Sequence, residues 1–342
     1  MTIRIVIVED SPTMRAILMA RLSREPDIEV VATAANAAEG RELIRRFDPD
    51  VVTLDIEMPG MNGLDFLDKI MALRPTPVII ISGATREGAA TTAEALARGA
   101  VACYAKDQGA EAFGGDGRLA ALIREAAQVK FARPAPATPA APALPAVRGP
   151  GAAPRLVAIG ASTGGVEALH AVLAGFPADC PPTLVVQHVN ARFAPSIAQS
   201  LDKACAPRVV LAEPDLPLRR GHIYLAPGDE RHLTVGATAS GTFHARLRPG
   251  PRMAGHLPSV DALFRSVAER VGAKAAGILL TGMGSDGAEG LLALHRAGAF
   301  TIAQDEATST VFGMPRAAIA LGAAQVIAPL ATIPAQLFQM AA

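Results

Sequence analysis

Short hydrophobic runs and helical patterns alternate through the first part of the chain. The runs are rich in β-branched residues, which favour strands. Between them, apolar residues recur at helical intervals, and Ile17, Leu18 and Leu22 share one helix face. Because each strand is followed by a helix, the pattern predicts an α/β domain with a doubly wound, five-stranded parallel sheet. The expected strands are Ile3–Val8, Val30–Ala34, Val51–Leu54, Val78–Ile81 and Val101–Tyr104.

The last part of the chain repeats the strand–helix order, with a helix expected from about Gly165. Residues 222–247 differ, because they contain short strand patterns and no helical spacing. We interpret them as an antiparallel insertion or sheet edge, so the pattern predicts a Rossmann-like parallel sheet with an antiparallel edge. Its other expected strands are Arg155–Ile159, Thr183–Val186, Val209–Leu211, Gly277–Leu280, Phe300–Ala303 and Gln325–Ile327.

A proline-rich stretch separates the two parts. Residues 133–154 contain seven prolines among 22 residues, and most of the others are Ala or Gly. Proline breaks helices and lacks the donor for a sheet ladder, so this composition predicts a semi-extended linker. The expected organisation is a first domain over residues 1–125, a linker over 126–154 and a second domain over 155–342.

Composition narrows the class of protein. The 342 residues include 32 basic and 32 acidic side chains, so the chain lacks the basic footprint of a nucleic-acid-binding protein. No apolar run approaches the roughly 18 residues of a membrane span, and the start does not resemble a signal peptide. Cys103, Cys180 and Cys205 form no CxxC pair and suit a reducing compartment. We therefore expect a cytoplasmic protein with no direct membrane insertion and no nucleic-acid partner.

Polar residues follow four of the five strands expected in the first domain. Glu9 and Asp10 come after the first strand, Asp55 after the third, Ser82 ends the fourth, and Lys106 follows the fifth. The carboxyl ends of parallel strands share one sheet edge, so these side chains should converge. Crowded carboxylates suit Mg²⁺, and a nearby ammonium would help hold phosphate oxygens. The pattern favours phosphoryl transfer to a carboxylate over a set of unrelated, solvated loop residues.

Residues 1–125 resemble a response-regulator receiver domain. The resemblance rests on Glu9-Asp10-Ser11, the stretch Leu54–Gly63, Ser82 and Lys106. It implies that Asp55 accepts phosphate from a histidine kinase and that Ser82 senses the phosphoryl group. The Mg²⁺ ligands that it implies are Glu9, Asp10, Asp55 and the backbone carbonyl of Glu57.

Two positions depart from the receiver pattern. Asp107 replaces the proline that usually follows the lysine. Cys103 stands where an aromatic switch residue is usual, with Tyr104 next to it. Neither departure affects the expected phosphorylation, but both weaken the resemblance as a guide to coupling through this face of the receiver.

A candidate nucleophile lies at the first strand–helix junction of the second domain. The segment Gly160–Gly165 contains G-x-S-x-G around Ser162, which is typical of a nucleophile elbow but also of a glycine-rich turn that caps a helix. His188 and Asp286 also follow expected strands, and they could supply the base and its orienting carboxylate. The chain order Ser, His, Asp differs from that of ordinary α/β-hydrolases.

The same region allows a second interpretation. Gly282 to Gly287 also reads G-x-G-x-x-G between a strand and a helix, and Asp305 ends the next strand, as in a dinucleotide-binding turn. On spacing alone the two interpretations are equal. The late position of the segment and the negative charge of Asp286 disfavour pyrophosphate. A non-catalytic interaction module is a third possibility.

Residues 155–338 resemble the catalytic domain of chemotaxis protein-glutamate methylesterases. The matching stretches include Ile159–Gly165, Val186–His188 and Leu279–Gly290. The resemblance implies a phosphorylation-activated serine hydrolase that demethylates glutamate methyl esters, and deamidates glutamine, on methyl-accepting chemoreceptors, with a chemotaxis histidine kinase as phosphodonor. Hydrolysis then needs no metal or other cofactor. The implied roles are nucleophile for Ser162, general base and acid for His188, orienting carboxylate for Asp286, and backbone oxyanion donors for Thr163 and Met283. Leu257 departs from the arginine expected there.

Overall fold

The chain folds into two compact units, Met1–Phe131 and Ala132–Ala342. The structure is a computed structural model that describes residues 2–58, 63–83, 85–106, 117–129, 154–238 and 241–338. Most of the expected linker and Asp107 lie outside these ranges. The domain limits expected from the sequence therefore stay a prediction.

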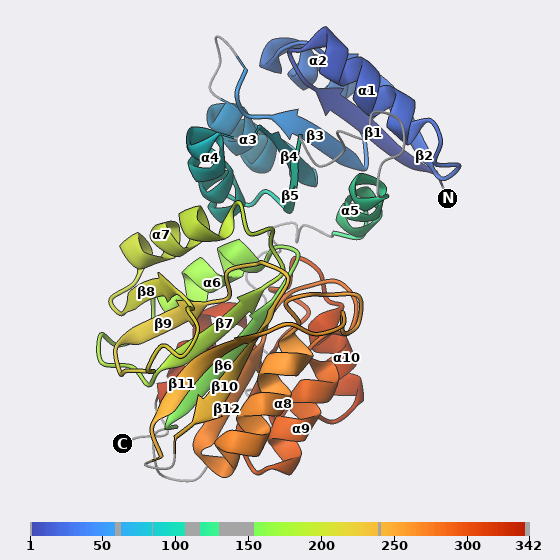
Figure 1. Ribbon diagram of the computed structural model, residues 1–342. Helices are drawn as coiled ribbons and strands as arrows, with labels where there is room; N and C mark the ends of the chain where they lie inside the picture. Colours follow the sequence, from blue (N-terminus) through green and yellow to red (C-terminus); the bar gives the residue numbers. More distant parts are fainter. Residues whose placement is uncertain are drawn as a thin grey trace. The chain divides into compact units, whose positions relative to one another are not determined.

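The first unit is a parallel sheet of five strands in the order β2-β1-β3-β4-β5 (Figure 1). This is the order of flavodoxin-like doubly wound folds, whose ligands bind at the carboxyl edge of the sheet. The strands are β1 (Ile3–Val8), β2 (Ile28–Ala34), β3 (Val51–Asp55), β4 (Val78–Ser82) and β5 (Ala102–Ala105), and the helices are α1 (Pro12–Leu22), α2 (Ala37–Phe47), α3 (Gly63–Leu73), α4 (Arg86–Ala97) and α5 (Arg118–Ala126).

Local sequence explains where the helices of this unit begin. Ser11 accepts a hydrogen bond from Met14 N and precedes Pro12, a residue suited to the first helical position. Asn36 and Thr85 cap α2 and α4 in the same way. β1, β2 and β4 therefore end within four residues of a capped helix start, and the polar residues that follow these strands are held at the sheet edge.

The second unit contains a parallel sheet of seven strands, in the order β14-β13-β12-β6-β7-β9-β8. Its strands are β6 (Leu156–Ala161), β7 (Thr183–Gln187), β8 (Arg208–Leu211), β9 (His222–Leu225), β12 (Ala275–Leu279), β13 (Phe300–Gln304) and β14 (Val326–Ala328), and its helices are α6 (Gly165–Leu173), α7 (Ala194–Ala204), α8 (Val260–Arg270), α9 (Ala288–Arg296), α10 (Met314–Ala320) and α11 (Ile333–Phe338). The chain leaves β6 toward β7 on one side and later returns to β12 on the other, so the carboxyl end of β6 is the topological switch point, where open α/β sheets bind their ligands.

The expected fold class of both domains is confirmed, and the antiparallel element expected within residues 222–247 is present as an insertion rather than as a sheet edge. β10 (His232–Ala237) and β11 (Phe243–Arg248) pair with each other in a separate two-stranded sheet, not at the edge of the large one. β9, from the same stretch of sequence, joins the large sheet in parallel between β7 and β8. Four residues are too few for a hydrophobic pattern to reveal which partner a strand will choose.

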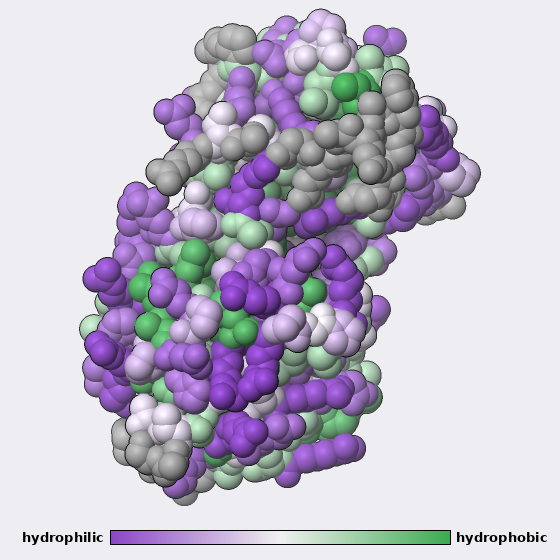
Figure 2. Space-filling view, viewed as in Figure 1, coloured by the Kyte–Doolittle hydropathy of each residue, from purple (hydrophilic) through white to green (hydrophobic). Residues whose placement is uncertain are grey.

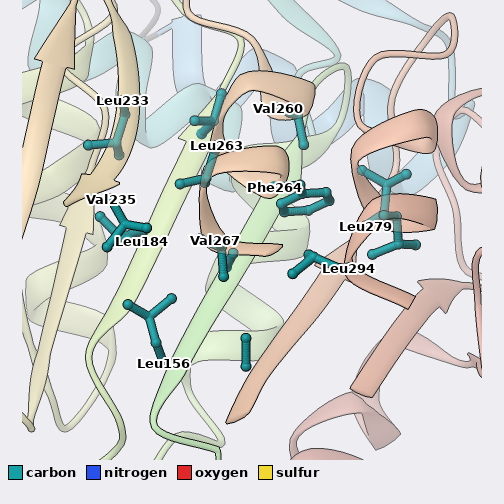
Figure 3. Close-up of a cluster of buried hydrophobic side chains, with 14 of the residues drawn as sticks. Leu156, Leu184, Leu233, Val235, Val260, Leu263, Phe264, Val267, Leu279 and Leu294 are labelled. Atoms are coloured by element: carbon teal, nitrogen blue, oxygen red, sulfur yellow. The ribbon is translucent and has the colours of Figure 1, made fainter. Parts of the chain in front are cut away.

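A hydrophobic cluster holds α8 between the large sheet and the β10–β11 pair (Figure 3). Leu263 and Phe264 on α8 are fully buried, as are Leu279 on β12 and Leu233 on β10. Burying a side chain of this size contributes about 1.5–3 kcal/mol. The cluster fixes the start of α8 close to the carboxyl edge of the sheet.

Within the described residues, no helix is both long and apolar enough to cross a membrane. On the face drawn in Figure 2, hydrophobic side chains form small, separated groups among hydrophilic ones.

Candidate active site

Ser162 lies in the tight turn between β6 and α6, at the carboxyl edge of the large sheet. The turn closes through a hydrogen bond from Gly165 N to Ser162 O of 2.7 Å. Gly164 adopts a φ of 74°, and a Cβ there would lie 2.4 Å from Thr310 Cβ, so only glycine fits. Gln187 Nε2 donates to Ser162 O at 2.8 Å from the end of β7. The hydroxyl therefore projects from a backbone that is fixed on both sides.

The imidazole of His188 connects Ser162 with Asp286. Its Nδ1 lies 3.1 Å from Ser162 Oγ, and its Nε2 lies 2.8 Å from Asp286 Oδ2. The carboxylate can only accept, so it assigns the ring proton to Nε2 and leaves the Nδ1 lone pair for the hydroxyl. The two ring nitrogens are thus used in the opposite sense to those of trypsin-like proteases. The three side chains expected from the sequence do meet.

Asp286 is fully buried, and the start of α8 supplies its remaining partners. Its carboxylate accepts from Ser259 Oγ at 2.7 Å, Val260 N at 2.8 Å and Asp261 N at 3.0 Å. Burial alone would raise the pKa of Asp286, but the hydrogen bond and charge of His188, with these donors, hold the pKa below its usual value. Asp286 thus stays ionised and can stabilise a positive imidazole.

Two contributors to this site were not identified from the sequence. Ser259 both caps α8 and donates to Asp286. The ring of His256 stacks on that of His188 with centroids 3.7 Å apart. The Pro-Ser pair before an amphipathic helix signals an N-cap, but no sequence signal reveals the stacking.

The geometry around Gly282–Gly287 disfavours a dinucleotide. A pyrophosphate would have to lie at the start of α9, where Gly290 N already donates to the carboxylate of Asp261 at 2.6 Å. Asp286 adds a second buried negative charge beside this turn. Gly282 instead serves close packing, since a Cβ there would lie 2.6 Å from Ser162 Cβ. Gly287 similarly faces Val260. Gly282 brings the end of β12 against the turn that carries Ser162.

In the first unit, Glu9, Asp55 and Lys106 form a buried charge cluster at the ends of β1, β3 and β5. Lys106 Nζ lies 2.6 Å from Asp55 Oδ2 and 3.1 Å from both Glu9 carboxylate oxygens. Burial, followed by the charge of Asp55, raises the pKa of Glu9 to about 7. Burial opposes the ammonium of Lys106, but its bonds to Asp55 and Glu9 prevail and raise its pKa. The cluster holds more carboxylates than one lysine can neutralise.

The same cluster suits a divalent cation. Oxygen atoms of Glu9, Asp10 and Asp55 lie within 4.8 Å of one another. Glu9 Oε2 is buried, and beyond its ion pair with Lys106 it receives no hydrogen bond from any described residue. An all-oxygen, anionic donor set that one lysine does not neutralise fits Mg²⁺.

Two other expected receiver residues lie at this edge. Ser82 is buried at the end of β4, where its Oγ donates to Gly88 O at 3.3 Å. Glu57 follows β3, and its N donates to Asp55 Oδ1 at 2.9 Å, so its backbone is tied to the acidic cluster. The side chain of Glu57 accepts from Thr85 Oγ1 at 3.1 Å.

Among the departures from the two family patterns, only the Cys103–Tyr104 pair has a local explanation. Tyr104 is buried, and its hydroxyl accepts from Arg21 Nη1 at 3.1 Å, so its ring is engaged with α1. Burial raises the pKa of the neighbouring Cys103 thiol to about 12. Asp107 lies outside the described residues, and nothing in the structure explains Leu257.

Comparison with known proteins identifies both units. Residues 5–113 match the response regulator receiver domain, and residues 157–337 match the family described as CheB methylesterase. The second match alone spans more than half of the chain. The chain belongs to the CheB methylesterase family. The receiver and carboxylic-ester hydrolase that the sequence predicts are thereby confirmed.

Relatives of this methylesterase match along almost the whole chain. The protein-glutamate methylesterase/protein-glutamine glutaminase of Rhizobium etli is 48% identical over 99% of this chain and 96% of its own length. That of Agrobacterium fabrum is also 48% identical, over 98% and 96%. The crystal structure of the Thermotoga maritima CheB methylesterase catalytic domain is 33% identical, with a TM-score of 0.53, and covers 55% of this chain and 99% of that one.

Proposed function

We propose that Ser162 is the nucleophile of a protein-glutamate methylesterase, with His188 as general base and acid and Asp286 as the orienting carboxylate. One observation carries this assignment: a single imidazole lies within hydrogen-bond distance of both the hydroxyl and a buried, ionised carboxylate. This arrangement suits nucleophilic acyl transfer.

The geometry gives each side chain a defined step. Ser162 Oγ bonds to the ester carbonyl carbon while its proton passes to His188 Nδ1. That proton then moves to the methoxy oxygen, the carbon–oxygen bond breaks, and methanol leaves an acyl-serine. A water attacks the acyl carbon, gives a proton to the same nitrogen, and releases the glutamate as Ser162 regains its hydrogen. Asp286 keeps its charge throughout and stabilises each imidazolium.

Backbone donors complete the proposed site. We infer that Thr163 N and Met283 N hold the oxyanion of the tetrahedral intermediates. Thr163 follows the nucleophile at the start of α6, and Met283 follows Gly282, which packs against Ser162. Peptide N–H groups at such a turn stabilise an anion without reorganising.

The substrate follows from the family and the chemistry. We propose that the chain hydrolyses methyl esters of glutamate on cytoplasmic helices of methyl-accepting chemoreceptors, as part of chemotaxis adaptation. Glutamine presents the same acyl carbon with ammonia as the leaving group, so the same three residues support its deamidation.

The first unit supplies control. We infer that Asp55 accepts phosphate from a chemotaxis histidine kinase and that this activates the hydrolase. Glu9, Asp10, Asp55 and the backbone carbonyl of Glu57 would hold Mg²⁺, which supplies positive charge against the phosphoryl oxygens. Lys106 lies next to the Asp55 oxygen already, and Ser82 is the group expected to contact the phosphoryl group.

Methanol release from a methylated chemoreceptor tests the assignment. In the full-length protein, Ser162→Ala should lower the rate at least about 10³-fold and abolish ammonia release from a glutamine-bearing receptor in parallel. Ser200→Ala on α7 is the matched control and should retain the wild-type rate. A Ser162→Ala protein that keeps more than a tenth of either activity would refute the assignment.

A further inference from the structure

His256 covers one face of the imidazole of His188. The two rings are stacked with centroids 3.7 Å apart and planes only 4° from parallel. The edge of His188 is already committed, because one nitrogen faces Ser162 and the other faces Asp286. Two edge contacts leave the ring free to tilt about the line that joins them, and a flat contact on its face opposes that tilt.

A tight turn carries His256 to this place. Met253 and His256 exchange both backbone hydrogen bonds, at 3.0 and 2.8 Å. The two residues between them, Ala254 and Gly255, have φ values of 46° and 84°. Two consecutive left-handed residues are typical of the tight type I′ turn, which leaves the flanking residues little freedom.

A second histidine holds both ends of the segment that carries this turn. His232 on β10 is buried, and its Nε2 lies 2.9 Å from Pro251 O while its Nδ1 accepts from Ser259 N at 3.2 Å. Ser259 in turn donates to Asp286. One buried ring therefore fixes residues 251 and 259, and the segment between them forms a strap beside the candidate triad.

We propose that His256 is a positioning residue of the methylesterase, whose uncharged ring fixes the plane of His188 and stabilises the imidazolium that forms when Ser162 gives up its proton. The proposal rests on the triad assigned above. An uncharged aromatic face attracts a cation stacked against it, whereas a charged one repels it.

The surroundings of His256 keep it uncharged. Burial and then the neighbouring His188 lower its pKa to about 4, and Arg252 on the strap lowers it further, while the Asp286 carboxylate acts in the opposite direction. These are the charged and titratable groups that face its ring. At neutral pH the stack can therefore hold one positive charge, on His188, without repulsion.

Three substitutions in the full-length protein separate positioning from simple filling of space. His256→Phe keeps a flat, uncharged ring, so its kcat for methanol release should stay within about 3-fold of wild type. His256→Ala removes the flat contact and should lower kcat by about 10- to 100-fold with KM within about 2-fold, because a small misplacement of a catalytic group is costly. His222→Ala is the control, because His222 begins β9 at the edge of the sheet away from the site. It should leave kcat and KM unchanged.

His256→Lys tests the electrostatic part. A permanent positive charge beside His188 disfavours its protonation, so the acid limb of the kcat/KM profile should move to lower pH, while His256→Phe should leave that limb in place. If His256→Ala does not fold, the Phe and Lys proteins decide the matter. Any of three results would overturn the proposal. They are equal pH profiles for these two proteins, a His256→Phe loss of kcat as large as that of His256→Ala, and a His256→Ala kcat within 2-fold of wild type.

Ser162→Ala belongs in the same assay. If it is inactive while His256→Ala is unaffected, the positioning role fails and the triad stands. If Ser162→Ala is fully active, both fail.

Discussion

Asp286 carries a negative charge in a fully buried position, and the start of α8 makes that position tolerable. Three donors from residues 259–261 converge on the carboxylate. An isolated buried carboxylate would take up a proton, but this one has its pKa held low by His188 and these donors. At the scale of residues, the charge of Asp286 beside His188 depends on donors from a neighbouring helix.

Ser259→Ala should show this dependence. It removes a donor to Asp286 and the N-cap of α8, so we expect the free energy of unfolding to fall by about 1–2 kcal/mol and kcat to fall as well. Ser266→Ala is the matched control, because Ser266 Oγ on the same helix donates to Leu263 O and accepts from Val235 N, away from the site. The control should lose stability and keep its kcat. Equal kcat values for the two variants would contradict a role for Ser259 in the site.

The low pKa of His256 should appear in the pH dependence of stability. The folded pKa is about 4 and the ordinary value is 6.5, so between these limits the unfolded chain binds the proton and the folded chain does not. The contribution of His256 to stability therefore falls as pH drops from about 6.5 to about 4. His256→Phe should flatten the decline in urea midpoint over this interval. Parallel curves for wild type and variant would contradict the assigned pKa.

Elements bring the site together by ending at one sheet edge. β6, β7 and β12 are neighbours in the large sheet, and each is followed by one residue of the candidate triad. The turn after β6 adds a steric requirement, since Gly164 is left-handed and faces Thr310. The turn that carries Ser162 thus depends on glycine for two separate reasons.

Gly164→Ala separates these two reasons when compared with Gly322→Ala. Gly322 has a similar φ of 67° but open space around the position of a Cβ, so its substitution should cost only the left-handed strain of about 1–2 kcal/mol. Gly164→Ala adds a Cβ at 2.4 Å from Thr310 Cβ and should cost more, with loss of methanol release as the turn shifts. Urea unfolding measures the loss of stability, and the ester assay measures the loss of methanol release. Equal losses of stability would show that Thr310 moves away freely.

Sequence patterns predicted the elements better than their partners. Continuous β-branched runs marked most parallel strands to within about two residues, because buried strands must be apolar on both faces. They could not show that β9 enters the large sheet, since pairing is decided by distant residues. The three triad candidates could be found because each follows a strand. His256 and His232 could not, because a ring stack and a clamp across the strap leave no local pattern.

At the scale of the whole molecule, the receiver and the hydrolase lie in separate compact units of one chain. The receiver unit holds an acidic cluster in which Lys106 pairs with both Asp55 and Glu9, and its oxygen atoms fit Mg²⁺. A covalent tether keeps a regulatory unit at high effective concentration, so even a weak effect of phosphorylation can be transmitted.

Asp55→Asn should uncouple the two units. The amide cannot accept phosphate, so a small phosphodonor with Mg²⁺ should stimulate methanol release by the wild type and leave the rate of this variant unchanged. Asp65→Asn on α3 is the control and should respond like wild type. Stimulation of the Asp55→Asn protein would place the phosphate elsewhere.

A double-mutant comparison tests the central claim most directly. If Ser162 and His188 act as one unit, Ser162→Ala, His188→Ala and the double variant should all lose a similar factor in kcat/KM for methanol release, of at least about 10³. Losses in the two single variants that multiply in the double variant would contradict the account, because they would show that the two side chains act independently.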